Sequence, residues 1–161
     1  MSQAHVVSIE ALAAWKDSLG LFADEGRDAL VAVEMEIRRA VDWLEEKTRL
    51  WHAEVRKSED LVVQAKAELT RRKMLPIVGK HPDCTEQEKA LRRAQARLEA
   101  AELKLETCRR WAPRLRKAIE EYQGMARPLA GWLEHDLPRA AAVLEQRIAA
   151  LERYVGGPPT P

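Results

Sequence analysis

The fold of this chain is decided by residues 91–133, whose sequence is LRRAQARLEAAELKLETCRRWAPRLRKAIEEYQGMARPLAGWL. Apolar or small residues recur along this stretch at steps that alternate between three and four. They are Leu91, Ala94, Leu98, Ala101, Leu105, Cys108, Ala112, Leu115, Ile119, Tyr122, Ala126, Leu129 and Leu133. Such an alternation, kept over many turns, is typical of a helix that packs along one line against another helix, as in a coiled coil. We call this line of positions the core seam.

A second run of the same kind precedes this stretch. From Leu30 to Leu69 the apolar or small residues again follow steps of three or four, and neither Pro nor Gly interrupts residues 27–75. Upstream, Ser8 can cap a helix that has apolar spacing at Ile9, Leu12, Trp15 or Lys16, Leu19 and Phe22. Two glycines in this segment each cost up to about 1 kcal/mol relative to Ala. We therefore predict one near-continuous helix over residues 9–74 with a soft spot, or else a separate short helix over residues 9–22.

Residues 75–84 break the pattern, because two prolines and a glycine cannot continue a helix. Thr85 and Glu88 have the spacing of a capping box, in which the Thr85 hydroxyl caps the Glu88 amide and the Glu88 carboxylate reaches back. This motif predicts that a helix begins at Thr85. The connection is short, so the second helix must return antiparallel along the first.

The end of the chain has weaker helical signals. Pro113 and Pro128 lie inside the predicted helix and should kink it. Asp136-Leu137-Pro138 predicts a restart, and the core seam continues at Ala141, Leu144, Ile148, Leu151 and Val155. We expect a disordered lead over residues 1–7, one domain over 8–155 with arms 9–74 and 85–155, and a disordered tail over 156–161.

The predicted fold class is all-α. We expect an elongated antiparallel helical hairpin, or coiled coil, that widens to a helical bundle at the end remote from the loop. The reason for the bundle is a second apolar stripe, one residue before the core seam. This flanking stripe consists of Trp43, Leu50, Trp111, Ala118, Met125 and Trp132. A two-helix hairpin needs only one seam, so the flanking stripe requires a cover.

The cover could come from the same chain, if its terminal segments folded back, or from another chain. We favour another chain, because Trp and Met are enriched at protein interfaces. The expected partner is a second copy, giving a homodimer, or another helical protein.

Charge separates some functional classes. The 161 residues carry 27 Lys plus Arg and 26 Asp plus Glu, a balance that does not suggest a strongly basic nucleic-acid binder. A local basic tip at Arg71, Arg72, Lys73 and Lys80 nevertheless makes contact with nucleic acid an alternative.

No residue pattern indicates chemistry. None of the histidines, His5, His52, His81 and His135, has a second His or a Glu at helical ligand spacing. Gly79-Lys80 lacks the other residues of a phosphate-binding loop. We expect no catalytic residue, metal, cofactor or small-molecule substrate, and we predict that the protein is not an enzyme.

Location follows from similar observations. Cys84 and Cys108, if both lie near one helix, are roughly 36 Å apart, beyond disulfide reach. There is no secretory signal, and no apolar run approaches the roughly 18 residues that span a membrane. We predict a cytoplasmic protein without membrane contact.

The predicted function is a non-catalytic structural, adaptor or assembly subunit that acts through coiled-coil contacts. One alternative is a nucleic-acid-associated protein that uses the basic tip. A second is a secretion-system hairpin of bacterial type, effector-like or chaperone-like. Small secreted hairpins have a Trp-x-Gly turn, whereas this turn contains Ile77-Val78-Gly79. The sequence is therefore not assigned to the secreted hairpins of the WXG100 type.

Overall fold

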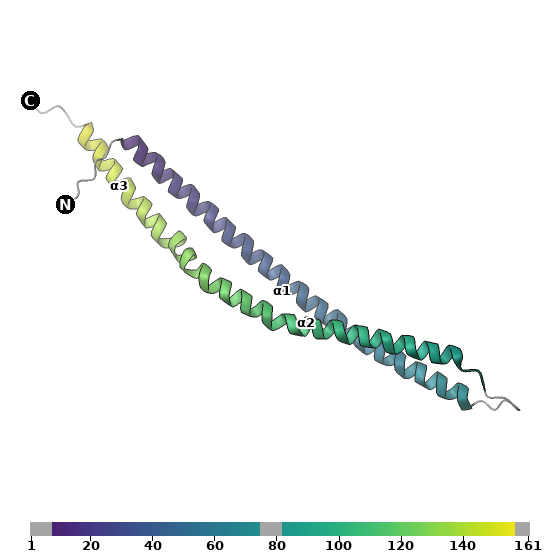
Figure 1. Cartoon of the computed structure of the whole chain (residues 1–161). Helices are drawn as coiled ribbons and strands as arrows, with labels where there is room; N and C mark the ends of the chain where they lie inside the picture. The colour runs from purple at the N-terminus through teal and green to yellow at the C-terminus, as the bar shows by residue number, and fades with distance from the viewer. Residues whose placement is uncertain (1–7, 75–81, 157–161) are drawn as a thin grey trace, which may run out of the picture. The chain divides into compact units, whose positions relative to one another are not determined.

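The structure is a computed structural model that describes residues 8–74 and 82–156. It contains α1 (Ile9–Met74), α2 (Thr85–Gly131), a π-helical turn η1 (Trp132–Asp136) and α3 (Leu137–Val155), as Figure 1 shows. The described residues form no strand, and the prediction of an all-α helical hairpin is confirmed. The predicted lead, most of the tip loop and most of the tail lie outside the described residues.

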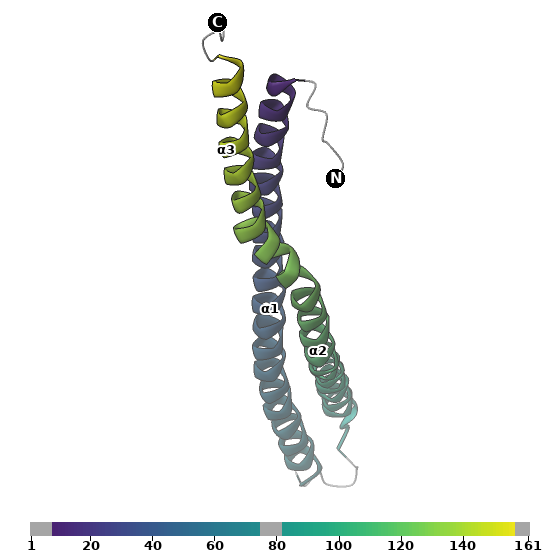
Figure 2. The same cartoon turned by 90° about the vertical axis from the view of Figure 1, so that its left-hand side faces the viewer.

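The chain divides into two compact units. The terminal unit contains residues 8–37 and 119–156, and the loop unit contains residues 38–74 and 82–118. In the terminal unit the first part of α1 lies beside α3, and in the loop unit the rest of α1 lies beside the first part of α2 (Figures 1 and 2). A single domain over 8–155 stays a prediction. The described residues of the terminal unit supply no further helix, so the widening to a helical bundle stays a prediction.

The start of α1 is capped as the sequence predicts. The Ala11 N–H donates to Ser8 Oγ at 3.1 Å, and the Ser8 hydroxyl donates to Glu10 Oε2 at 2.7 Å. The second bond favours the charged carboxylate and lowers the pKa of Glu10. From there α1 runs without a break to Met74. The alternative of a separate helix over residues 9–22 is therefore wrong.

The core of the terminal unit forms where α1 meets η1 and the start of α3. Ala23, Leu133 and Leu137 are buried together, and Leu19 and Leu30 pack against them. Leu133 has no exposed surface. Burial of these side chains is the main favourable contribution to the stability of such a small unit.

One predicted core position of α1 is corrected by the structure, and the choice between two alternatives at another is decided. Phe22 is half exposed, and Ala23 takes the buried position one residue later. Of the alternatives Trp15 and Lys16, Lys16 is the one that faces α3, where its Nζ lies 2.8 Å from Glu145 Oε2. This ion pair raises the pKa of Lys16. At these two positions the residues that face the partner helix, Lys16 and Ala23, thus each follow the larger residue, Trp15 or Phe22, by one position.

Gly26 has a packing role that the sequence pattern does not reveal. A Cβ atom added to it would lie 2.9 Å from Leu133 Cδ1 and 3.0 Å from Cδ2. At Gly20 an added Cβ would meet nothing within 4 Å. The glycine therefore allows the buried leucine to approach the α1 backbone.

We predict opposite results for alanine at these two glycines. Gly20→Ala should raise the free energy of unfolding by up to about 1 kcal/mol through helix propensity. Gly26→Ala should give no gain, because Leu133 is enclosed and cannot move away from the new methyl group. Urea unfolding of both variants measures the difference. Equal stabilisation by the two substitutions would contradict the close approach of Leu133.

The core seam of the loop unit agrees with the predicted one. Its buried residues are Leu44, Ser58, Val62, Ala101, Leu105 and Cys108. Ser58 and Ala101, the most deeply buried of them, are both small, which permits close packing of the helices. Among the described residues Ser58 Oγ has no hydrogen-bond partner.

A helix begins at Leu137 with Pro138 in its first turn, as the sequence predicts, but it follows a π-helical turn over Trp132–Asp136. Leu137 donates its N–H to the carbonyl oxygen of Trp132, five residues earlier. A π turn holds one residue more than an α turn. It thus shifts the seam: Leu137 is buried, which the sequence did not predict, and Ala141 follows it. Val155, predicted in the seam, is 73% exposed.

Candidate protein-interaction surfaces

The flanking stripe is exposed in the loop unit. Trp43 is 59% exposed, Trp111 54% and Leu50 47%, and Ala118 is exposed as well. In an antiparallel pair, the positions that precede the core seam on the two helices lie on the same side. These four residues therefore form one apolar surface, shared by α1 and α2, within this unit.

The two exposed tryptophans of the loop unit, Trp43 and Trp111, each have a cation over the ring. Lys47 Nζ lies 5.9 Å from the ring centroid of Trp43, and Arg114 Cζ lies 5.5 Å from that of Trp111. Such cation–π contacts contribute about 0.5–1 kcal/mol at exposed sites. They favour fixed positions for the rings, which lowers the entropy cost of a later contact with a partner.

In the terminal unit the flanking stripe continues with Met125 and Trp132, which are 74% and 42% exposed. The Trp132 ring packs edge-to-face against Phe22 of α1, with ring centroids 6.0 Å apart and an interplanar angle of 73°. Phe22, which the sequence pattern assigned to the core, therefore belongs to this surface.

Further apolar residues on this side of the terminal unit were not predicted. Trp15 is 57% exposed and Val143 50% exposed. They border a hollow lined by Trp15, Asp136, Arg139, Ala140, Val143, Leu144 and Arg147. A signal was present in the sequence, since Trp15, Ala140 and Val143 each precede a seam position by one residue. We call Trp15, Phe22, Trp132, Ala140 and Val143 the terminal face.

The basic tip is partly engaged within the chain. Arg71 forms an ion pair with Glu68 at 2.8 Å, and Arg72 Nε donates to the backbone oxygen of Asp83 at 3.4 Å. Lys73 lines a hollow whose other lining residues include Asp83 and Glu88. Lys80 lies outside the described residues. The three described cations thus have acidic or carbonyl groups close by.

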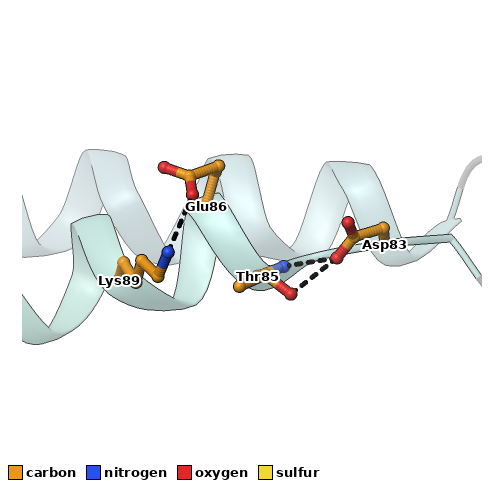
Figure 3. A network of polar contacts seen from close by, with 4 residues as sticks. All are labelled: Asp83, Thr85, Glu86 and Lys89. Carbon is orange, nitrogen blue, oxygen red and sulfur yellow. Dashed lines mark hydrogen bonds and ion pairs between the residues drawn. The ribbon is translucent and has the colours of Figure 1, made fainter.

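The start of α2 corrects the predicted capping box. The helix begins at Thr85, as predicted, but the Glu88 N–H donates to the backbone oxygen of Cys84 at 2.9 Å and not to the Thr85 hydroxyl. Asp83 supplies the cap instead: its Oδ1 accepts the Thr85 N–H at 3.0 Å and the Thr85 hydroxyl at 2.7 Å (Figure 3). In the next turn Lys89 pairs with Glu86 at 3.1 Å.

The cap makes part of the stability pH-dependent. The hydrogen bonds from Thr85 lower the pKa of Asp83. Because the folded pKa is below the unfolded value of about 3.9, the stabilisation is complete above that value and is lost as the pH falls through the folded pKa. We expect Asp83→Asn to remove this loss from unfolding midpoints measured between pH 2 and 6. Asp60→Asn, on an exposed face of α1, should keep the wild-type profile, and identical profiles for all three proteins would contradict the role of the cap.

Three further features of the described residues bear on function: metal-binding groups, cysteines and the apolar content of the helices. No group of three His, Cys, Asp or Glu side chains within residues 8–74 and 82–156 is placed to hold a metal ion. Cys84 and Cys108 are free thiols. No helix among the described residues has the length and apolar content needed to cross a bilayer.

Comparison of the chain with protein-family models, curated proteins and solved structures gave no match.

Proposed function

We propose that the protein is a non-catalytic assembly or adaptor subunit that acts through helical contacts with a second copy or with another helical protein. The observation that supports this proposal most is the exposure of the flanking stripe. All six of its residues are exposed, including three tryptophans with 42–59% of their surface in solvent. Exposed apolar residues that adjoin one another, as these do within each unit, mark interaction sites in soluble proteins.

The composition of this surface also fits a protein interface. Trp, Met and Arg are enriched at interfaces, and Trp and Arg are frequent among the residues that dominate binding energy. In the loop unit, Trp111 with Arg114 over its ring combines both types. A cytoplasmic location belongs to the same proposal and has no separate support.

Light scattering and tryptophan quenching test the proposal together. A purified chain that self-associates should give a mass near twice 18.3 kDa, and its tryptophans should become less accessible to acrylamide as the concentration rises. Trp132→Glu should fold with the same helix content, and its remaining tryptophans should stay accessible to acrylamide at all concentrations. A monomer at high micromolar concentration, with full quenching throughout, would contradict self-association.

The two alternative functions are not favoured by any described contact. For the nucleic-acid alternative, Arg71 and Arg72 already bind groups of the chain itself. Submicromolar binding to nucleic acid at physiological salt, lost on charge reversal of Arg71 and Arg72, would establish that alternative.

A further inference from the structure

We propose that the terminal face docks on the terminal face of a second copy, with α1 of each copy against α3 of the other and the two α1 helices parallel. The proposal rests on the assembly function proposed above, and it names the partner and the contact residues. Four of its features carry the argument: the side on which the face lies, the alternation of large and small residues, the area, and the charge at its edges.

The terminal face is a single side of the terminal unit. Phe22 of α1 touches Trp132 of η1, and Trp15 shares a hollow with Ala140 and Val143 of α3. Phe22 lies seven residues after Trp15, so two turns separate them on the same side of α1. The face is therefore continuous over both helical segments.

Large and small residues alternate across this face. The contacts of Gly26 with Leu133 and of Lys16 with Glu145 fix the register of the two segments. In that register Phe22 lies within about one turn of the level of Ala140, and Trp132 within about one turn of the level of Ala29. Phe22 and Trp132, which contact each other, thus each also have an alanine close by on the neighbouring helix.

A twofold axis parallel to the helices converts this alternation into a fit. It places α1 of one copy over α3 of the other at the same level. Trp15 of each copy then enters the hollow beside Ala140 and Val143 of its partner, and Trp132 covers Ala29 of its partner. The same patch pairs with itself, so the assembly closes as a dimer.

The exposed aromatic side chains supply a sizeable part of the area that a stable dimer needs. Trp15, Phe22 and Trp132 keep 57%, 51% and 42% of their surface exposed. Since a buried aromatic side chain covers roughly 150–250 Å², these three alone offer about 300 Å² of apolar surface. Met125, Leu129 and Val143 are also exposed and add to this apolar area. Each partner in a standard interface contributes about 800 Å².

The charges at the edges select the parallel arrangement. Glu25 lies at the α1 edge of the face, whereas Arg139 and Arg147 border the hollow on the α3 side together with one acid, Asp136; all four are exposed. Within the described part of the chain no ion pair is found for them. Docking α1 on α3 brings acidic edges to basic edges twice per dimer, whereas docking α1 on α1 would oppose like charges.

Substitutions on and off the face test whether it joins two copies. Light scattering of the full chain should give twice 18.3 kDa, and Trp15→Glu should weaken association at least tenfold. Val31→Glu is the matched control: Val31 is also exposed on α1 of this unit, on the other side of the helix. Arg139→Glu should weaken the dimer, and adding Glu25→Arg should restore it. A monomeric wild type at high micromolar concentration would overturn the arrangement together with self-association.

Cross-linking between chains tests the orientation. In a background with Cys84→Ser and Cys108→Ala, chains with Ser18→Cys are mixed with chains with Ala140→Cys. The mixture should form disulfide-linked pairs on oxidation, and neither variant alone should do so. A dimer in which Ser18→Cys chains link to each other, or in which the mixture does not link, would overturn this arrangement and leave the proposed function standing.

Discussion

Leu133→Ala is expected to lower the free energy of unfolding by about 2–5 kcal/mol, the range found when a fully buried leucine is shortened in a core. The side chain of Leu133 has no exposed surface. It lies against Gly26 of α1 and is buried together with Ala23 and Leu137. Gly26 and Ala23 on α1 cannot fill the cavity, because the first has no side chain and the second has only a methyl group. We therefore expect a value in the upper part of that range, measured by urea unfolding.

Leu21→Ala provides the matched control for this prediction. Leu21 lies in the same unit and is 65% exposed, so its shortening removes little buried surface. The free energy of unfolding should change by less than about 1 kcal/mol. If Leu21→Ala and Leu133→Ala had equal effects, the core of the terminal unit would not lie where the structure places it.

The ends of the long helices could be predicted because local chemistry determines them. Ser8 accepts a backbone N–H at the start of α1, and the proline-rich segment after Met74 cannot continue a helix. The capping residue of α2 was assigned wrongly. Both Asp83 and Thr85 are residues that can cap, and only the backbone path decides which of them reaches the first free N–H groups.

The core seam was predicted better in α2 than at the start of α1. In α2 the apolar periodicity is unbroken, and among its predicted seam residues only Leu129, at 44%, is exposed. At residues 15–23 a large aromatic residue is twice followed directly by a charged or small one, at positions two turns apart. The pairs Trp15–Lys16 and Phe22–Ala23 allow two rotations of the helix. The choice depends on the partner helix, where Leu133 fills the space and Glu145 binds Lys16.

The candidate surface was predicted in part. The exposure of Trp43, Trp111 and Trp132 follows from their position beside the seam. The exposure of Trp15 and Phe22 could not be predicted in the same way, because the apolar spacing of α1 is compatible with both residues in the core.

The π turn is the feature that the sequence shows only in retrospect. The seam residues Leu133 and Ala141 are eight positions apart, one more than the heptad spacing that precedes and follows them. In a regular helix this extra residue would rotate all of α3 by about 100° away from α1. The π turn at Trp132–Asp136 absorbs it, so that Leu133 and Ile148 are both buried.

Removal of one residue from this turn should therefore be tolerated. We expect deletion of Glu134, which is exposed, to convert the π turn to a regular α turn while Leu133 and Ile148 stay buried. The deletion is best made together with Pro138→Ala, because a proline inside a regular helix costs about 3 kcal/mol. Relative to Pro138→Ala alone, the free energy of unfolding should change by no more than about 1 kcal/mol.

Deletion of Gln123 in the same background is the control with the large expected effect. Gln123 is also exposed, but it lies in α2 where the spacing is regular. Its loss rotates one side of the helix by about 100°, so that Leu133 and Leu137 turn away from α1. Since each buried leucine contributes about 2–5 kcal/mol, the terminal unit should lose most of its stability. A residue can be deleted without rotating the core residues only where the helix already contains one residue too many. Equal unfolding curves for the two deletions would therefore show that the extra residue does not lie in η1.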